Sequence, residues 1–204
     1  MPVECHRPEG TVILLRFAEL TDARGEIDQA NLRSARATDI YILKGDPKGE
    51  VFEPHFTYHG FRYVEVTGFP GAPTQDHLQG IVIHSDLDFT GTLRIDNSLI
   101  RTLWHNALWS QRSNFMGIPT DCPQRDERLG WLGDANVFWD AATFNMDVSA
   151  FTRRFMGDVR AAQAVGGAFS DFSPAAFRFP VKGDRSGAAR PMARSAMIVR
   201  PAIS

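Results

Sequence analysis

Apolar and polar residues alternate in short runs along the first ninety or so residues, and Gly, Pro and Asp separate these runs. A period of two predicts β-strands with one face on a core. The predicted strands are 11–18, 37–43, 61–67, 78–84 and 91–95. Several short strands with turn signals between them are typical of a β-sandwich. The pattern therefore predicts a β-sandwich domain over residues 1–94.

The pattern changes near residue 96, where apolar residues begin to recur at intervals of three and four. The run 96–98, Asp-Asn-Ser, offers a helix cap, and an apolar stripe then continues to about Ser113. A second helix is predicted over 134–146, and Asp147 can cap a third that carries apolar residues every four positions over 151–159. A β-domain thus precedes a helical region.

The last part of the chain follows neither period. Residues 1–150 carry 13 Lys/Arg and 21 Asp/Glu, whereas residues 151–204 carry 9 and 3. A basic tail on an acidic body is typical of a partner-binding arm, or of a segment foreign to the fold. Pro and Gly are scattered through the residues from 175 onward, so we expect a disordered end, and both interpretations stay open at this point.

Composition excludes several classes of protein. The 204 residues are 43% hydrophobic and 23% charged, which is ordinary for a soluble globular chain. A net charge of −2 argues against a nucleic-acid or membrane-surface binder. Two cysteines fit neither a disulfide framework nor a zinc site, and no signal peptide or membrane-spanning run is evident. We expect a cytoplasmic protein without a cofactor; its oligomeric state does not follow from the sequence.

The loop between the first two predicted helices carries the candidate chemistry. Its charged and aromatic residues are Asp121, Arg125, Asp126, Glu127, Arg128, Trp131 and Asp134. Glycoside hydrolysis needs a carboxylic acid and a carboxylate, and a sugar needs polar partners and an aromatic face. A solvated or ion-paired loop would have the same composition. A calcium site fits poorly because Arg residues interrupt the acids, and we predict no metal.

The stretch 113–134 resembles the signature of the bacterial α-L-rhamnosidases of glycoside hydrolase family 78. The likeness continues through 135–147 and is present upstream at 32–39, 56–63 and 84–87. This resemblance implies a β-domain followed by an (α/α)6 catalytic barrel. The chain would then be a truncated α+β multidomain protein, with the first barrel helices in residues 95–172. The resemblance stops near Phe172, so 173–204 is expected to be a disordered tail outside the family, such as a shifted reading frame would produce.

The resemblance also implies inverting hydrolysis of terminal α-L-rhamnosides. The carboxylate in the Arg-Asp-Glu-Arg run is the family's general acid, which gives that role to Glu127. Asp126 would support the loop, and Cys122 is expected to be a buried small residue. The positions that match the family's rhamnose-binding residues are Asp121, Arg125, Trp131 and Asp134.

One catalytic group is missing from the sequence. The family's general base is a later glutamate, and no glutamate follows Glu127. We therefore expect a fragment that is inactive alone, and whose helices leave aromatic faces without partners. The aromatic residues in question are Phe138, Trp139, Phe144, Phe151 and Phe155. Two alternatives remain: a carbohydrate-binding β-sandwich that catalyses nothing, and an interaction protein with the tail as its arm.

Overall fold

A computed structural model describes residues 9–175, 199–200 and 202–203 of the chain. Most of the predicted tail 173–204, namely residues 176–198, 201 and 204, lies outside the described residues. The chain divides into two compact units. The first comprises 1–83, 124–126 and 195–204, and the second comprises 84–123 and 127–194.

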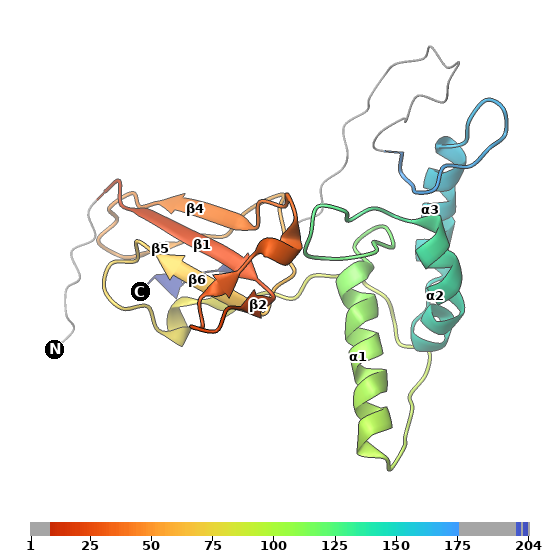
Figure 1. Ribbon diagram of the computed structural model, residues 1–204, viewed down its shortest axis with the longest axis horizontal. Helices are drawn as coiled ribbons and strands as arrows, with labels where there is room; N and C mark the ends of the chain where they lie inside the picture. Colours follow the sequence, from red (N-terminus) through yellow and green to blue (C-terminus); the bar gives the residue numbers. More distant parts are fainter. Residues whose placement is uncertain (1–8, 176–198, 201, 204) are drawn as a thin grey trace. The chain divides into compact units, whose positions relative to one another are not determined.

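The centre of the first unit is an antiparallel sheet of order β4-β1-β6 (Figure 1). Its strands are β1 (Val12–Ala18), β4 (Thr38–Ile42) and β6 (Tyr63–Thr67). Alternation along β1 places Ile13, Leu15 and Phe17 on one face, where all three are buried. On the other face Arg16 lies opposite Glu65 and pairs with it at 2.7 Å. The first three predicted strands are thus confirmed.

Short elements complete the unit. The two-stranded pairs are β2 (Leu20–Thr21) with β3 (Ile27–Asp28), β5 (Glu50–Val51) with β9 (Ala202–Ile203), and β7 (Gln79–Gly80) with β8 (Val199–Arg200). Two 3-10 helices, η1 (Ala30–Leu32) and η2 (Gln75–His77), lie between strands. An apolar core on the buried face of β1 contains Leu15, Phe17, Leu32 and Ala37.

The predicted strands 78–84 and 91–95 are wrong. Only Gln79 and Gly80 of the first form a strand, and residues 91–95 form none. Backbone groups between these segments bond to helix ends instead: Ser85 N–H donates to Phe115 at 2.8 Å, and Thr90 N–H donates to Asn145 at 3.2 Å. Sequence alternation does not reveal such partners, because a strand needs a neighbouring strand as well as a pattern.

Glu50 organises a tight loop in the first unit. Its buried carboxylate accepts the N–H groups of Lys44, Gly45 and Asp46 and the hydroxyl of Tyr41, at 2.5 to 3.1 Å. The hydrogen bond from Lys44 N–H, followed by that from Tyr41, lowers the pKa of Glu50 to about 2. The carboxylate therefore stays ionised and satisfies backbone donors that would otherwise have no partner.

Three helices form the second unit: α1 (Ser98–Asn114), α2 (Leu132–Asn145) and α3 (Ser149–Ala161) (Figure 1). The cap predicted at the start of α1 is confirmed, because the Asn97 side chain accepts N–H bonds from the first turn. Helix α2 begins two residues earlier than predicted. At α3 the cap position is Val148, while the Asp147 carboxylate accepts the Ser149 N–H at 2.9 Å.

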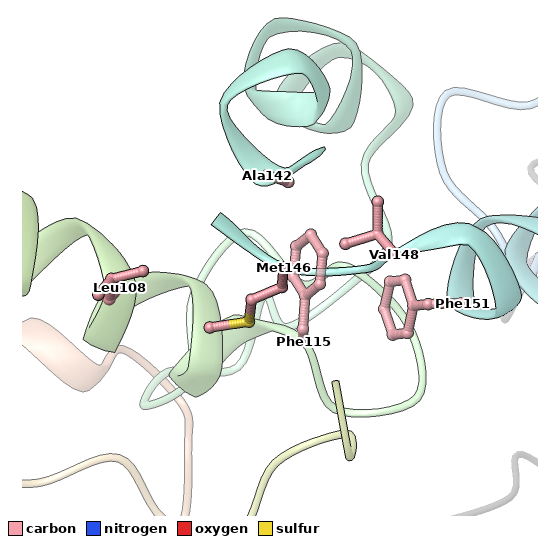
Figure 2. Packing of buried hydrophobic residues seen from close by; sticks show 6 residues of the cluster. All are labelled: Leu108, Phe115, Ala142, Met146, Val148 and Phe151. Atoms are coloured by element: carbon pink, nitrogen blue, oxygen red, sulfur yellow. The ribbon is translucent and has the colours of Figure 1, made fainter. Parts of the chain in front are cut away.

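The apolar core of this unit draws residues from α1, α2, α3 and the segments that follow α1 and α2 (Figure 2). It consists of Leu108, Phe115, Ala142, Met146, Val148 and Phe151. Phe115 and Phe151 are stacked with ring centroids 4.6 Å apart and an interplanar angle of 3°. Phe115 follows the last residue of α1, so this stack fixes the point where the chain leaves the helix and enters the candidate loop.

A buried amide pair joins α1 to α2. Asn145 Nδ2 donates to Gln111 Oε1 at 2.9 Å, and Gln111 Nε2 donates to the Ala142 carbonyl at 3.3 Å. Gln111 is only 1% exposed and Asn145 8% exposed. A buried amide without partners would cost free energy, so each side chain here depends on the other.

The expectation of unpartnered aromatic faces is correct for Phe144 and wrong for two others. Phe151 and Phe155 are buried, and Phe138 and Trp139 pack partly against the core. Phe144, in contrast, is 78% exposed. Within the part of the chain that the structure describes, none of the helices is both long enough and apolar enough to cross a bilayer.

Candidate active site

The charged loop connects α1 to α2, and hydrogen bonds between residues 121 and 129 close it at its base. Asp121 N–H donates to the Leu129 carbonyl at 3.2 Å, and Leu129 N–H donates to Asp121 Oδ1 at 3.1 Å. Arg128 also donates to the Pro123 carbonyl at 3.4 Å. Residues 121 and 129 are therefore held side by side, and the Arg-Asp-Glu-Arg run lies on the excursion between them.

Closing the loop brings Glu127 next to Asp121. One carboxylate oxygen of each, together with the thiol of the buried Cys122, lie within 4.8 Å of one another. An inverting pair needs about 6.5–9.5 Å between its carboxyl groups to admit water. Asp121 is thus too close to Glu127 to serve as its inverting base, although it is well placed to contact a sugar that Glu127 protonates.

The same three groups have the spacing of metal ligands. Ca²⁺ and Mg²⁺ are bound by oxygen, so the Cys122 thiol does not suit these ions. Such groupings of acids also occur in proteins that hold no ion. Spacing alone does not make a metal site, and the absence of a metal stays a prediction.

An open cavity of about 500 Å³ lies within the second unit, between the end of α1, the start of the loop and the start of α2. Asp121 and Asp134 both line it, and Asp134 lies in the first turn of α2. The structure therefore brings together two of the four predicted sugar-binding residues, although they lie thirteen positions apart in sequence.

Two lining residues were not predicted from the sequence. Gln111 and Asn114, near the end of α1, contribute polar groups to the cavity. Gln111 continues the apolar stripe one turn beyond Leu108, and a lone polar residue on a buried stripe is the signal that would have identified it. Its carbonyl oxygen already accepts from Asn145, so its position in the cavity wall is fixed.

The remaining predicted residues lie along the loop. Arg125, Glu127 and Trp131 are each half-buried and are not among the described residues that line the cavity. Glu127 lies beside the cavity, because one of its carboxylate oxygens is within 4.8 Å of an oxygen of Asp121, which lines the cavity. Trp131 precedes α2 and packs edge-on against Phe172, with ring centroids 5.2 Å apart.

Asp126 belongs with the first unit, as do residues 124 and 125. Its carboxylate accepts hydrogen bonds from the hydroxyl and the N–H of Ser34, and Arg33 lies 3.9 Å away. The hydroxyl bond from Ser34 contributes most to lowering the pKa of Asp126, and the Arg33 charge adds to it. These contacts agree with a supporting role for Asp126 in the loop.

Comparison with known proteins places both parts of the chain among rhamnosidases. Residues 1–84 match the bacterial alpha-L-rhamnosidase concanavalin-like domain, and residues 88–193 match the bacterial alpha-L-rhamnosidase 6 hairpin glycosidase domain. An alpha-L-rhamnosidase of Streptomyces avermitilis is 49% identical over 166 residues, covering 81% of this chain. One from Formosa agariphila is 42% identical over 156 residues.

Solved structures agree. The alpha-L-rhamnosidase from Dictyoglumus thermophilum has a TM-score of 0.79 at 47% identity over 82% of this chain. The Streptomyces avermitilis enzyme, complexed with L-rhamnose, has a TM-score of 0.81 at 47% identity over 85% of this chain. The match spans only 16% and 17% of the two curated relatives, and 19% and 17% of the two solved chains.

Proposed function

This chain belongs to the bacterial α-L-rhamnosidases, and from that premise we propose that it supplies the acid and the sugar-holding side of an inverting α-L-rhamnosidase site. Glu127 protonates the glycosidic oxygen as the bond breaks. Asp121 and Asp134 hold hydroxyl groups of the rhamnose, together with Arg125, and Trp131 packs on its ring. Asp121 and Asp134 line one cavity, and Glu127 adjoins it.

The observation that carries this proposal is the convergence at Asp121. Its side chain lines the cavity together with Asp134 and also lies within 4.8 Å of an oxygen of Glu127. A volume of about 500 Å³ falls in the usual range of small-molecule sites, about 300–1,000 Å³. A single sugar unit in this cavity would thus contact polar residues while its glycosidic oxygen faces the acid.

The substrate class follows from the family and from the chemistry of the loop. A related enzyme has been crystallised with L-rhamnose. Carboxylates and a guanidinium are strong partners for sugar hydroxyls, and an indole suits the apolar C–H face. We propose rhamnose-terminated glycosides or oligosaccharides as ligands.

Binding is the direct test of this assignment. We expect Asp134→Asn to weaken L-rhamnose binding by about tenfold to a hundredfold, because a charged hydrogen bond contributes about 1.5–3 kcal/mol. The matched control is Asp140→Asn, an exposed carboxylate further along α2, which should leave the affinity unchanged. Ligand-observed NMR on the purified chain measures both, and equal affinities in the two variants would contradict the role of Asp134.

Hydrolysis is a separate question, because no glutamate follows Glu127 and Asp121 lies too close to act as the inverting base. We expect the chain to bind rhamnose and to leave an aryl α-L-rhamnoside intact. Turnover that Glu127→Gln abolishes would show that the chain is catalytic. In that case NMR of the fresh product decides the mechanism, since retention of the anomer would assign a nucleophile to the close Asp121–Glu127 pair.

A further inference from the structure

We propose that Phe172 is a positioning residue for the sugar-stacking ring of Trp131, held opposite it by a strap of residues 171–173. The inference rests on the proposed function, because it concerns how the stacking surface for rhamnose is oriented. All of the contacts that support it lie within the second unit.

The strap is paired with the start of α2 through the backbone. Leu132 N–H donates to the Asp171 carbonyl at 2.8 Å, and Ser173 N–H donates to the Gly130 carbonyl at 2.9 Å. These two bonds flank an isolated antiparallel bridge between Trp131 and Phe172. Forty-one positions of sequence separate the bridged residues, so this contact is a tertiary feature and not a local turn.

The hydrogen-bond pattern determines which side chains meet. Because the bonds lie on either side of the bridge, Trp131 and Phe172 form a non-hydrogen-bonded pair, the type in which opposite side chains approach most closely. Their rings accordingly meet edge to face, with centroids 5.2 Å apart and an interplanar angle of 62°. Phe172 is 3% exposed, so its ring has little freedom to turn away.

Glycine at position 130 allows the strap to come this close. A Cβ there would lie 2.3 Å from the carbonyl oxygen of Ser173 and 3.0 Å from the ring of Phe155. Phe155 is buried and stacks on Trp139, so it has no room to retreat. Gly130 therefore lies between Ser173 of the strap and the buried ring of Phe155, which fixes the strap beside Trp131.

The orientation of the Trp131 indole determines which of its atoms a sugar can contact. Its indole Nε1 is buried and has no hydrogen-bond partner among the described residues, so any accessible part of the ring is carbon. Carbon surface is what the C–H face of a sugar stacks on. A ring held at a fixed tilt loses no rotational freedom when the sugar binds, which strengthens binding. Phe172 never touches the sugar and acts through this tilt.

Fluorine NMR of the chain labelled with 5-fluorotryptophan tests the proposal. The four tryptophans give four signals, which substitution of each by Phe assigns. Without sugar, Phe172→Ala and Phe172→Leu should both shift or broaden the Trp131 signal. The Trp104 and Trp109 signals should stay in place. Leu keeps the apolar packing, so its effect isolates the loss of the ring edge, and an unchanged Trp139 signal reports an intact core.

The second readout is affinity. We expect L-rhamnose to bind about three- to tenfold more weakly to Phe172→Leu, the range of an aromatic pair contact. A wild-type Trp131 signal and affinity in this variant would overturn the positioning role. If the Trp131 signal of the unmodified chain does not respond to L-rhamnose, the proposed function fails instead. The sugar-free shift in the Phe172 variants still decides whether this residue orients the indole.

Discussion

Glu50 determines the acid stability of the first unit more than any other described carboxylate with a shifted pKa. Its folded-state pKa of about 2 lies below the unfolded value of about 4.3. A lowered pKa stabilises the fold above the unfolded value, and the contribution is lost as pH falls through that value toward 2. We expect the unfolding temperature of the first unit to drop steeply as the pH falls from about 4.3 to about 2, the window spanned by these two values.

Circular dichroism melts of Glu50→Gln provide the comparison. The variant should melt lower than the unmodified chain at pH 7 and approach it near pH 2, because protonation then removes from the unmodified chain the carboxylate that the variant lacks. Glu26→Gln is the control, since Glu26 is exposed and its carboxylate pairs with Arg24 at the surface. A constant difference between Glu50→Gln and the unmodified chain across this window would contradict the assignment.

The candidate site was partly predictable at the residue scale. The charges of 121–134 left a structural and a sugar-binding interpretation open, and only the resemblance gave Glu127 its role. Cys122 is buried, as predicted. Gln111 could have been identified as a polar residue on the buried stripe of α1, whereas Phe172 was missed because its contact with Trp131 spans 41 positions, which no spacing rule reveals.

The helices were predicted well as elements, because their period and caps are local. Asn97 and the apolar stripe of α1 correspond closely to the observed helix. The strands at 78–84 and 91–95 were predicted wrongly. Between them, the backbone N–H groups of Ser85 and Thr90 bond to residues at the ends of α1 and α2 and not to a neighbouring strand. The sequence pattern does not identify the partner to which each backbone N–H group bonds.

The amide pair between α1 and α2 makes a prediction at this scale. Asn145→Ala leaves the buried Oε1 of Gln111 without its partner, so the free energy of unfolding should fall by about 1–3 kcal/mol. Thr143→Ala, on the exposed side of the same helix, should change it by less than about 0.5 kcal/mol. Urea unfolding followed by tryptophan fluorescence measures both, and equal values would show that the pair contributes nothing.

At the scale of the whole chain, the order of a β-domain and a helical glycosidase domain is confirmed by the two family models. Both units leave large apolar side chains exposed, and the highest exposed fractions lie in the helical unit. Several large side chains of the helices stay exposed, with Leu99 at 77%, Leu103 at 67%, Val137 at 84% and Phe144 at 78%. Exposed surface of this kind contributes nothing to folding and favours self-association.

We therefore expect the helical unit to be cleaved first in limited proteolysis, while a fragment that holds the sheet β4-β1-β6 survives. Mass spectrometry of the time course identifies the order of cleavage. A single resistant core spanning about 10–165 would contradict the prediction, because it would show that both units are equally stable.

The loop between Asp121 and Leu129 is closed at its base by a reciprocal pair of hydrogen bonds. Such a base separates the loop from the ends of α1 and α2, while Asp126 within the loop is held by Ser34. The length and side chains of the loop can change while α1 and α2 keep their places. For protein engineering, this suggests varying residues 123–125, which leaves Asp126 and Glu127 in place, as a way to alter sugar preference without redesigning the scaffold.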